Sequence, residues 1–183
     1  MMSKKLSASD IDRWIASTER RVQRSGKTSG AMLSRRFEFG IDEIWTACTD
    51  AQQLRKWFGS VSGDLRESGT VKMDVGAPCS ISSKILVCEP PHHLLVTWEY
   101  GEVPPDLVDQ VELRLNAKGD KTTHMELEHR SGAKGDWWFG AGSGWEFALM
   151  KLRFLLEGGD PFSLPVEEID QALGRVWMSA GNA

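Results

Sequence analysis

Residues 143–159, SGWEFALMKLRFLLEGG, have the pattern of a long amphipathic helix. Large apolar side chains recur in this stretch at three- and four-residue spacing, which places them on one helical face. These residues are Trp145, Leu149, Leu152 and Leu156. Ser143 and Glu146 have the spacing of a capping box at the start of the helix, and Gly158 and Gly159 end it. Such a helix needs an apolar surface to cover, and the segments before it predict a sheet.

Five short segments ahead of the helix predict the strands of that sheet. Each is rich in Val, Leu and Thr, and turn sequences such as EPPH and AKGDK separate them. The segments are residues 70–75, 80–88, 93–100, 107–116 and 123–129. The short connections predict antiparallel pairing. Apolar and polar residues alternate most clearly in the last two segments, so we expect one face to be covered and the other to be wet.

Residues 30–58 predict a strand followed by two short helices. The strand is expected over 30–39 and the first helix over 40–48, GIDEIWTAC. The second helix, TDAQQLRKWF, opens with Thr49 as its cap and Gln52 three residues later. Its apolar stripe consists of Leu54, Trp57 and Phe58.

Both ends of the chain predict helical additions to a central domain. Residues 7–22 have the spacing of a short helix, with the alternative that the chain turns to strand near ERRVQR at 19–24. The turn-rich SGKTSG at 25–30 is either a hairpin tip or a joint between an arm and the main domain. Residues 165–180 predict a last helix that packs on the body or on a partner. We therefore divide the chain into an N-terminal helix and arm (1–29), a central domain (30–158) and a C-terminal helical extension (159–183).

Composition excludes several classes of function. A chain of 183 residues with 40% hydrophobic residues can bury one sizeable core. The formal net charge of −4 argues against a nucleic-acid partner. No apolar run is long enough to cross a bilayer and the start lacks a signal peptide, so we expect a cytoplasmic protein with no membrane contact. The cysteines, Cys48, Cys79 and Cys88, match no metal pattern, and we predict reduced thiols and no metal site.

Four stretches together resemble one family. They are RRFEFGIDEIWTACTDAQQLRKWFGSVSGDLRESG, CEPPHHLLVTWEY, HMELEHRSG and GSGWEFALMKL. This combination is similar to the START-like (SRPBCC) superfamily, and specifically to homologues of the activator of the heat-shock protein 90 ATPase. The resemblance covers residues 30–157. Its markers are Trp45, Thr49, Trp57, Gly63, Asp64, Gly69, Pro90, Trp98, His129, Gly144 and Trp145.

The resemblance implies an α+β helix-grip fold, in which a curved antiparallel sheet wraps around a long C-terminal helix. It also implies an apolar cavity between helix and sheet, since most members of the family look like binding proteins. A few members of the superfamily carry out chemistry.

Histidines are the first candidates for chemistry in such a cavity. His92 and His93 lie in a predicted turn, and His124 and His129 fall on opposite faces of one strand, so no pair is placed to hold a metal. His129 shares a face with Met125 and Leu127, which is the expected cavity side. It either bonds a backbone carbonyl or a carboxylate such as Glu99 or Glu146, or serves as a polar contact for a ligand.

A second aromatic cluster lies in GDWWFGAGSGW, which we interpret as a Gly-rich loop before the long helix. Trp137, Trp138 and Phe139 cannot all face one core, so at least one should be exposed, line a cavity or meet another chain. Asp64, in SGDLR, either caps a turn or forms a polar rim with Arg66.

We hypothesise that the protein binds a small hydrophobic or aromatic molecule between the sheet and the long helix, without a cofactor and without catalysis. The expected walls are Trp57, Phe58, Trp98, Leu113, Met125, Leu127, Trp138, Phe139, Trp145 and Leu149, with His129 as the polar contact.

Two alternatives come from other classes. A protein-interaction module, either a chaperone partner or a homodimer, predicts exposed aromatic side chains and a closed interior. A hydrolase or cyclase predicts a titratable group with a shifted pKa deep in the cavity near His129. The burial of Trp138 and Phe139 and the hydrogen-bond partner of His129 separate these alternatives from ligand binding.

Overall fold

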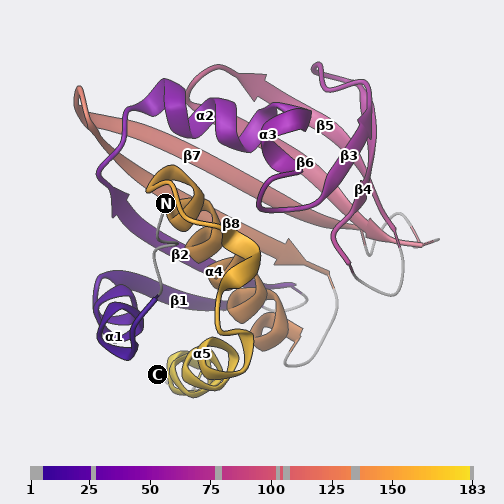
Figure 1. Ribbon diagram of the computed structural model, residues 1–183. Coiled ribbons are helices and arrows are strands. Elements are labelled where there is room, and N and C mark those ends of the chain that lie inside the picture. The colour runs from indigo at the N-terminus through magenta and orange to yellow at the C-terminus, as the bar shows by residue number, and fades with distance from the viewer. Residues whose placement is uncertain are drawn as a thin grey trace.

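The computed structural model describes residues 6–25, 28–76, 80–101, 104, 108–132 and 137–181. Cys79 lies outside the described residues, and so does the side chain of Trp137. Figure 1 shows a curved sheet with α4 lying against it, and with α1 and α5 near the β1 end of the sheet.

The sheet is a single antiparallel layer in the order β1-β2-β8-β7-β6-β5-β4-β3. Its strands are β1 Thr18–Ser25, β2 Thr28–Phe37, β3 Ser60–Gly63, β4 Thr70–Asp74, β5 Ile81–Glu89, β6 His93–Tyr100, β7 Asp109–Gly119 and β8 Thr122–Ser131. The helices are α1 Ala8–Ala16, α2 Ile41–Thr49, α3 Ala51–Leu54, α4 Trp137–Leu156 and α5 Val166–Gly181, with the 3-10 turn η2 at Pro161–Ser163. This arrangement confirms the predicted α+β helix-grip fold.

The helices lie on the face of the sheet that holds the core. α4 contacts β2 and β8, α2 contacts β7, and α3 contacts β3. Strand β8 alternates as its sequence predicts, with Met125, Leu127 and His129 buried on the side of the helices. No helix among the described residues has both the length and the apolar composition that a membrane span requires.

The sheet begins earlier in the chain than we expected. β1 pairs with β2 along its whole length, from Thr18 opposite Arg35 to Ser25 opposite Thr28. The turn-rich segment 25–30 therefore belongs to a hairpin, which was one of its two interpretations. The sheet starts at Thr18, ahead of residue 30, where we placed the start of the central domain.

Two further elements differ from expectation. β3, SVSG, was not predicted because three of its four residues are exposed and only Val61 is buried. α3 is capped by Asp50, not by Thr49: the Asp50 carboxylate accepts from the backbone N–H groups of Gln52 and Gln53. Thr49 instead donates to the Trp45 carbonyl at 2.7 Å, one turn back in α2.

The long helix begins at Trp137, so the predicted capping box at Ser143 is wrong. The Ser143 hydroxyl donates to the Phe139 carbonyl at 3.0 Å inside the helix. Of the glycines that suggested a loop, Gly142 has a packing role, because a Cβ there would lie 2.5 Å from the Trp177 ring of α5. Close approach of α5 therefore requires glycine in the first half of α4.

Candidate functional site

A cavity of about 120 Å³ lies between the inner face of the sheet, the α2–α3 segment and α4. Valine, leucine, methionine and aromatic side chains make up most of its wall, and among the described residues no charged side chain lines it. Seven of the predicted wall residues line the cavity: Trp57, Phe58, Trp98, Leu113, Leu127, Trp145 and Leu149. The fold thus brings together residues as distant in the sequence as Cys48 and Leu149.

Four predicted residues do not line the cavity. Met125 is fully buried on β8 beyond the cavity wall, and His129 lies behind the wall. Trp138 is 5% exposed and Phe139 is half-buried. Both belong to the first turn of α4 and face α5, where a Cβ at Gly174 would lie 3.7 Å from the Phe139 ring. Their predicted role as cavity walls was wrong because the helix begins earlier than its capping signal suggested.

Most of the remaining wall comes from β3, β4, β5 and β6, which our prediction left out apart from Trp98. The other lining residues that we did not predict are Cys48, Thr49, Leu54, Leu65 and Val111. Val71 and Met73 on β4 and Ile85 on β5 are buried and line the cavity. Their alternation with exposed residues in TVKMD is visible in the sequence and could have identified them.

Phe58 occupies the centre of an aromatic cluster at one end of the cavity. Its ring stacks on Trp145 with centroids 5.7 Å apart and planes inclined by 11°. It also contacts Trp57 at 5.3 Å and Trp98 at 6.2 Å. Trp57 is 3% exposed and donates its indole N–H to the Ala47 carbonyl at 2.9 Å. Trp57 is therefore fixed to α2, whereas half-buried Phe58 is the more accessible of the two.

His129 supports the cavity wall from behind. The indole N–H of Trp145 donates to His129 Nδ1 at 3.0 Å, so Nδ1 is an acceptor and carries no proton. His129 Nε2 lies 3.0 Å from Asp109 Oδ2 and donates to it. The predicted polar contact is thus a neutral histidine whose carboxylate partner is Asp109, in place of the expected Glu99 or Glu146. It holds Trp145 in position, and its ring also contacts Trp98 with centroids 6.2 Å apart, so it supports two residues of the cavity wall.

The cavity thiols have little nucleophilic character. Burial raises the pKa of Cys48 to about 12. Burial and the nearby Glu67 carboxylate also raise the pKa of Cys88. Both side chains line the cavity, and both are protonated at neutral pH. The described residues include no group of His, Cys, Asp and Glu side chains that could hold a metal ion.

Asp64 lies in an exposed turn beside the cavity. Its carboxylate accepts from the backbone N–H of Arg66 at 3.2 Å and from the Arg66 guanidinium at 2.9 Å. These contacts lower the Asp64 pKa. Leu65 between them lines the cavity, so the turn places an apolar side chain in the wall beneath an exposed ion pair.

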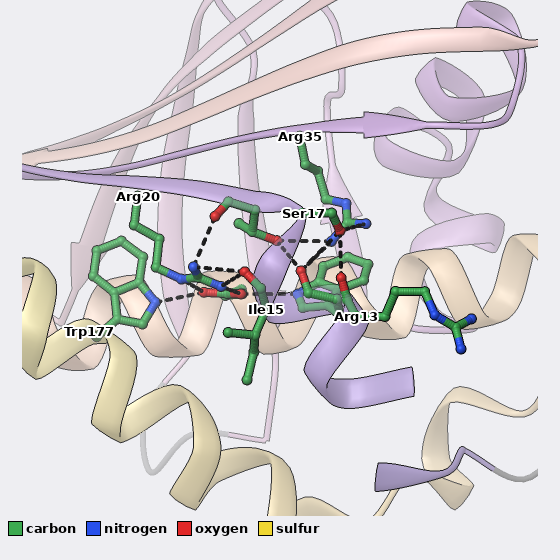
Figure 2. Close-up of polar contacts among 9 residues, drawn as sticks. Arg13, Ile15, Ser17, Arg20, Arg35 and Trp177 are labelled. Carbon is green, nitrogen blue, oxygen red and sulfur yellow. Dashed lines mark hydrogen bonds and ion pairs between the residues drawn. The ribbon is translucent and has the colours of Figure 1, made fainter. Parts of the chain in front are cut away.

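A cluster of polar contacts surrounds Glu146, on the side of α4 that faces the terminal helices. Figure 2 shows Arg20 and Trp177 directed toward one carboxylate. Glu146 is fully buried and accepts from Trp14 Nε1 at 3.0 Å, Arg20 Nε at 2.7 Å and Trp177 Nε1 at 2.8 Å. We call Trp14, Arg20, Glu146 and Trp177 the Glu146 cluster. It joins α1, β1, α4 and α5 and has no part in the cavity.

Arg35 extends the same region, as Figure 2 also shows. Its guanidinium lies 3.3 Å from the ring centroid of Trp14 and donates to Thr18 Oγ1 at 2.9 Å. Burial and the charge of Arg153 lower the Arg35 pKa to about 9, which leaves it charged at neutral pH. The cation fixes α1 against the sheet through stacking and hydrogen bonds.

Comparisons with known proteins agree with this architecture. Residues 38–157 match the family model described as activator of Hsp90 ATPase homolog 1-like protein. The crystal structure of CalU16 from Micromonospora echinospora is similar over 91% of this chain and 99% of its own, with 34% identity and a TM-score of 0.72. Among proteins with curated descriptions, no sequence matches significantly.

More distant structures share the fold alone. An HSP90 activator from Plasmodium falciparum covers 60% of this chain and 77% of its own, with 15% identity and a TM-score of 0.51. The solution structure of the Aha1 dimer from Colwellia psychrerythraea is similar over 69% of this chain and 96% of its own, with 18% identity and a TM-score of 0.59.

Proposed function

This chain belongs to the family of activator of Hsp90 ATPase homolog 1-like proteins, and we propose that it binds a small apolar or aromatic molecule without transforming it. The molecule would lie in the space between the sheet and the long helix. The observation that carries the proposal is the cavity of about 120 Å³ with an uncharged, largely apolar wall.

The size of the cavity supports a ligand of about one ring. An engineered apolar cavity of about 150 Å³ in another protein stays dry and binds benzene. The cavity beside Trp145 is of similar size, and its wall carries aromatic faces that suit a ring. Half-buried Phe58 lines the cavity, so movement of its ring would make room for larger ligands.

The surrounding groups favour binding over catalysis. A general base needs a free nitrogen or oxygen within reach of the substrate. Nδ1 of His129 accepts from Trp145, and Nε2 donates to Asp109, so both ring nitrogens are engaged by protein groups. The Cys48 thiol is held protonated by its high pKa. A hydrolase or cyclase would need a reactive group that this wall does not supply among the described residues.

Titration of the intrinsic tryptophan fluorescence with benzene and toluene tests the proposal, since three tryptophans line the cavity. We expect a saturable change in emission. Val96→Phe fills the cavity with a ring and should abolish the response. Val87→Phe is the matched control: Val87 pairs with Leu95 and does not line the cavity, so the response should persist. A non-saturable response, or one that Val96→Phe leaves intact, contradicts the proposal.

A protein-interaction role is the second proposal, and the family description supports it. It takes two forms, a chaperone contact and a homodimer. Trp138 is buried, which argues against the aromatic surface that this alternative predicts there. Stimulation of an Hsp90 ATPase by stoichiometric amounts of the chain, or a dimeric mass by light scattering, would favour it.

A further inference from the structure

Two polar atoms in the cavity wall are buried and have no hydrogen-bond partner among the described residues. They are the Ser83 hydroxyl oxygen and the Trp98 indole nitrogen. Ser83 is 1% exposed and Trp98 is 6% exposed, and both residues line the cavity. Buried polar groups in proteins nearly always have a partner, so two unpartnered groups in one wall call for an explanation.

Ser83 and Trp98 are neighbours across the sheet. In the pairing of β5 with β6, Ser82 lies opposite Glu99 and Ile85 lies opposite Val96. Because these two pairs share one antiparallel register, we infer that Ser83, which lies between them, faces Trp98. Ser83 also pairs with Val71, another cavity residue. Side chains directly opposite on one face have Cβ atoms about 5 Å apart, so one small group can reach both.

The other tryptophans of the wall differ from Trp98. Trp57 donates to the Ala47 carbonyl and Trp145 donates to His129 Nδ1. Among the indole N–H groups of this wall, only that of Trp98 lacks an acceptor within the described residues. Ser83 supplies a second donor and also an acceptor. The pair therefore suits an oxygen atom that accepts from Trp98 and exchanges a hydrogen bond with Ser83.

We propose that the ligand is a neutral ring of about benzene size with one oxygen substituent, a phenol or an aryl carbonyl, whose oxygen bonds Trp98 Nε1 and Ser83 Oγ. This inference rests on the ligand binding proposed above. A neutral oxygen is required because, in the part of the chain that the structure describes, no cationic side chain lines the cavity to balance a carboxylate. The ring would lie against Trp145 and Phe58, which already stack on each other.

Phenol and toluene test the inference, because they have nearly the same shape and differ in the oxygen. Calorimetric affinities are measured for the full chain and for Ser83→Ala, Trp98→Phe and Ser82→Ala. Ser82→Ala is the matched control, since its side chain lies on the opposite face of β5. In the wild type we expect phenol to bind at least as tightly as toluene. Ser83→Ala and Trp98→Phe should each lower the ratio of phenol affinity to toluene affinity about tenfold, and Ser82→Ala should leave this ratio unchanged.

Each outcome decides between the two proposals. If both ligands bind and neither variant changes the ratio of their affinities, the oxygen site is wrong while cavity binding stands. A tightly held water that satisfies Ser83 and Trp98 would give this same result and also overturns the inference. If neither ligand binds the wild type, both proposals fail. Thermal melting confirms folding, and Ser83→Ala should melt no lower than the wild type because it removes an unpartnered hydroxyl.

Discussion

His129 illustrates how a single residue can be placed on the correct face and assigned the wrong contact. Alternation in β8 predicts its inward direction, and the side chain is 2% exposed. Its partners come from two other elements, Asp109 on β7 and Trp145 on α4. The consequence is a positioning role: His129 orients the Trp145 ring that lines the cavity.

Cys48 provides a test of burial at the scale of one side chain. Burial raises the pKa of Cys48 to about 12, so the thiol is protonated at pH 8. We expect iodoacetamide at pH 8 to leave Cys48 unmodified in the native protein, as measured by peptide mass spectrometry. The same treatment in urea should modify it fully. Native labelling at the unfolded rate would show that the thiol is not enclosed.

The lowered pKa of Glu112 predicts that the stability of the folded protein depends on pH. Burial acts to raise its pKa, but the hydrogen bond from His93 and the charges of Arg114 and Arg130 lower it overall. A carboxyl group with a pKa lower in the folded than in the unfolded state stabilises the protein above the unfolded value. That contribution is lost as the pH falls through the folded value.

The corresponding experiment is urea unfolding of Glu112→Gln between pH 7 and pH 3. At pH 7 we expect the free energy of unfolding to fall by about 2 kcal/mol, because His93 and the arginines lose their buried partner. The difference from wild type should shrink below the ordinary glutamate pKa. Glu126→Gln, at a more exposed carboxylate, is the control. A difference that stays constant with pH would contradict the assignment.

At the scale of elements, periodic patterns predicted most strands and helices, and the errors occurred at their ends. Five predicted strands correspond to β4 through β8 with ends shifted by a few residues. The start of α4 was misplaced because Ser143 and Glu146 satisfy the capping rule in sequence while their side chains bond elsewhere. β3 has too few apolar residues to be recognised without its partner β4.

The contact between α4 and α5 gives a prediction for Gly142. Alanine favours helix over glycine by about 1 kcal/mol, but here its Cβ would lie 2.5 Å from the Trp177 ring. We expect Gly142→Ala to destabilise by about 2 kcal/mol net and to lower the melting temperature. Gly144→Ala on the same helix meets nothing within 4 Å and should raise the melting temperature by about 2–4 °C. Equal effects at the two sites would refute close packing of α5.

At the scale of the whole molecule, one buried carboxylate joins the two ends of the chain. Glu146 bonds Trp14 of α1, Arg20 of β1 and Trp177 of α5, which are distant in sequence. The helical additions at the termini are thereby tied to the same helix whose other face lines the cavity. Sequence patterns could not predict this, because Glu146 resembles an ordinary capping residue.

Glu146→Gln should loosen both terminal helices together. The substitution leaves the Arg20 charge buried with a weaker partner, at an expected loss of about 3–5 kcal/mol. Hydrogen exchange should quicken over 8–16 and 166–181 more than over β5 to β7. Glu168→Gln, at an exposed position of α5, should change neither. Faster exchange in only one of the two helices would show that they are anchored separately.

The sequence by itself determined most of the helices and strands and the inward face of strands such as β8, because these follow from a local periodicity of apolar residues. Its resemblance to one family indicated the fold class. Tertiary structure alone decided the size of the cavity and the partners of its polar groups. The same valines, leucines and tryptophans can fill a core or enclose a space, and only their distances distinguish the two. Trp57 and Trp145 each have a hydrogen-bond acceptor, and Trp98 has none among the described residues. This difference depends on which backbone and side-chain atoms the fold brings within about 3 Å of each indole nitrogen.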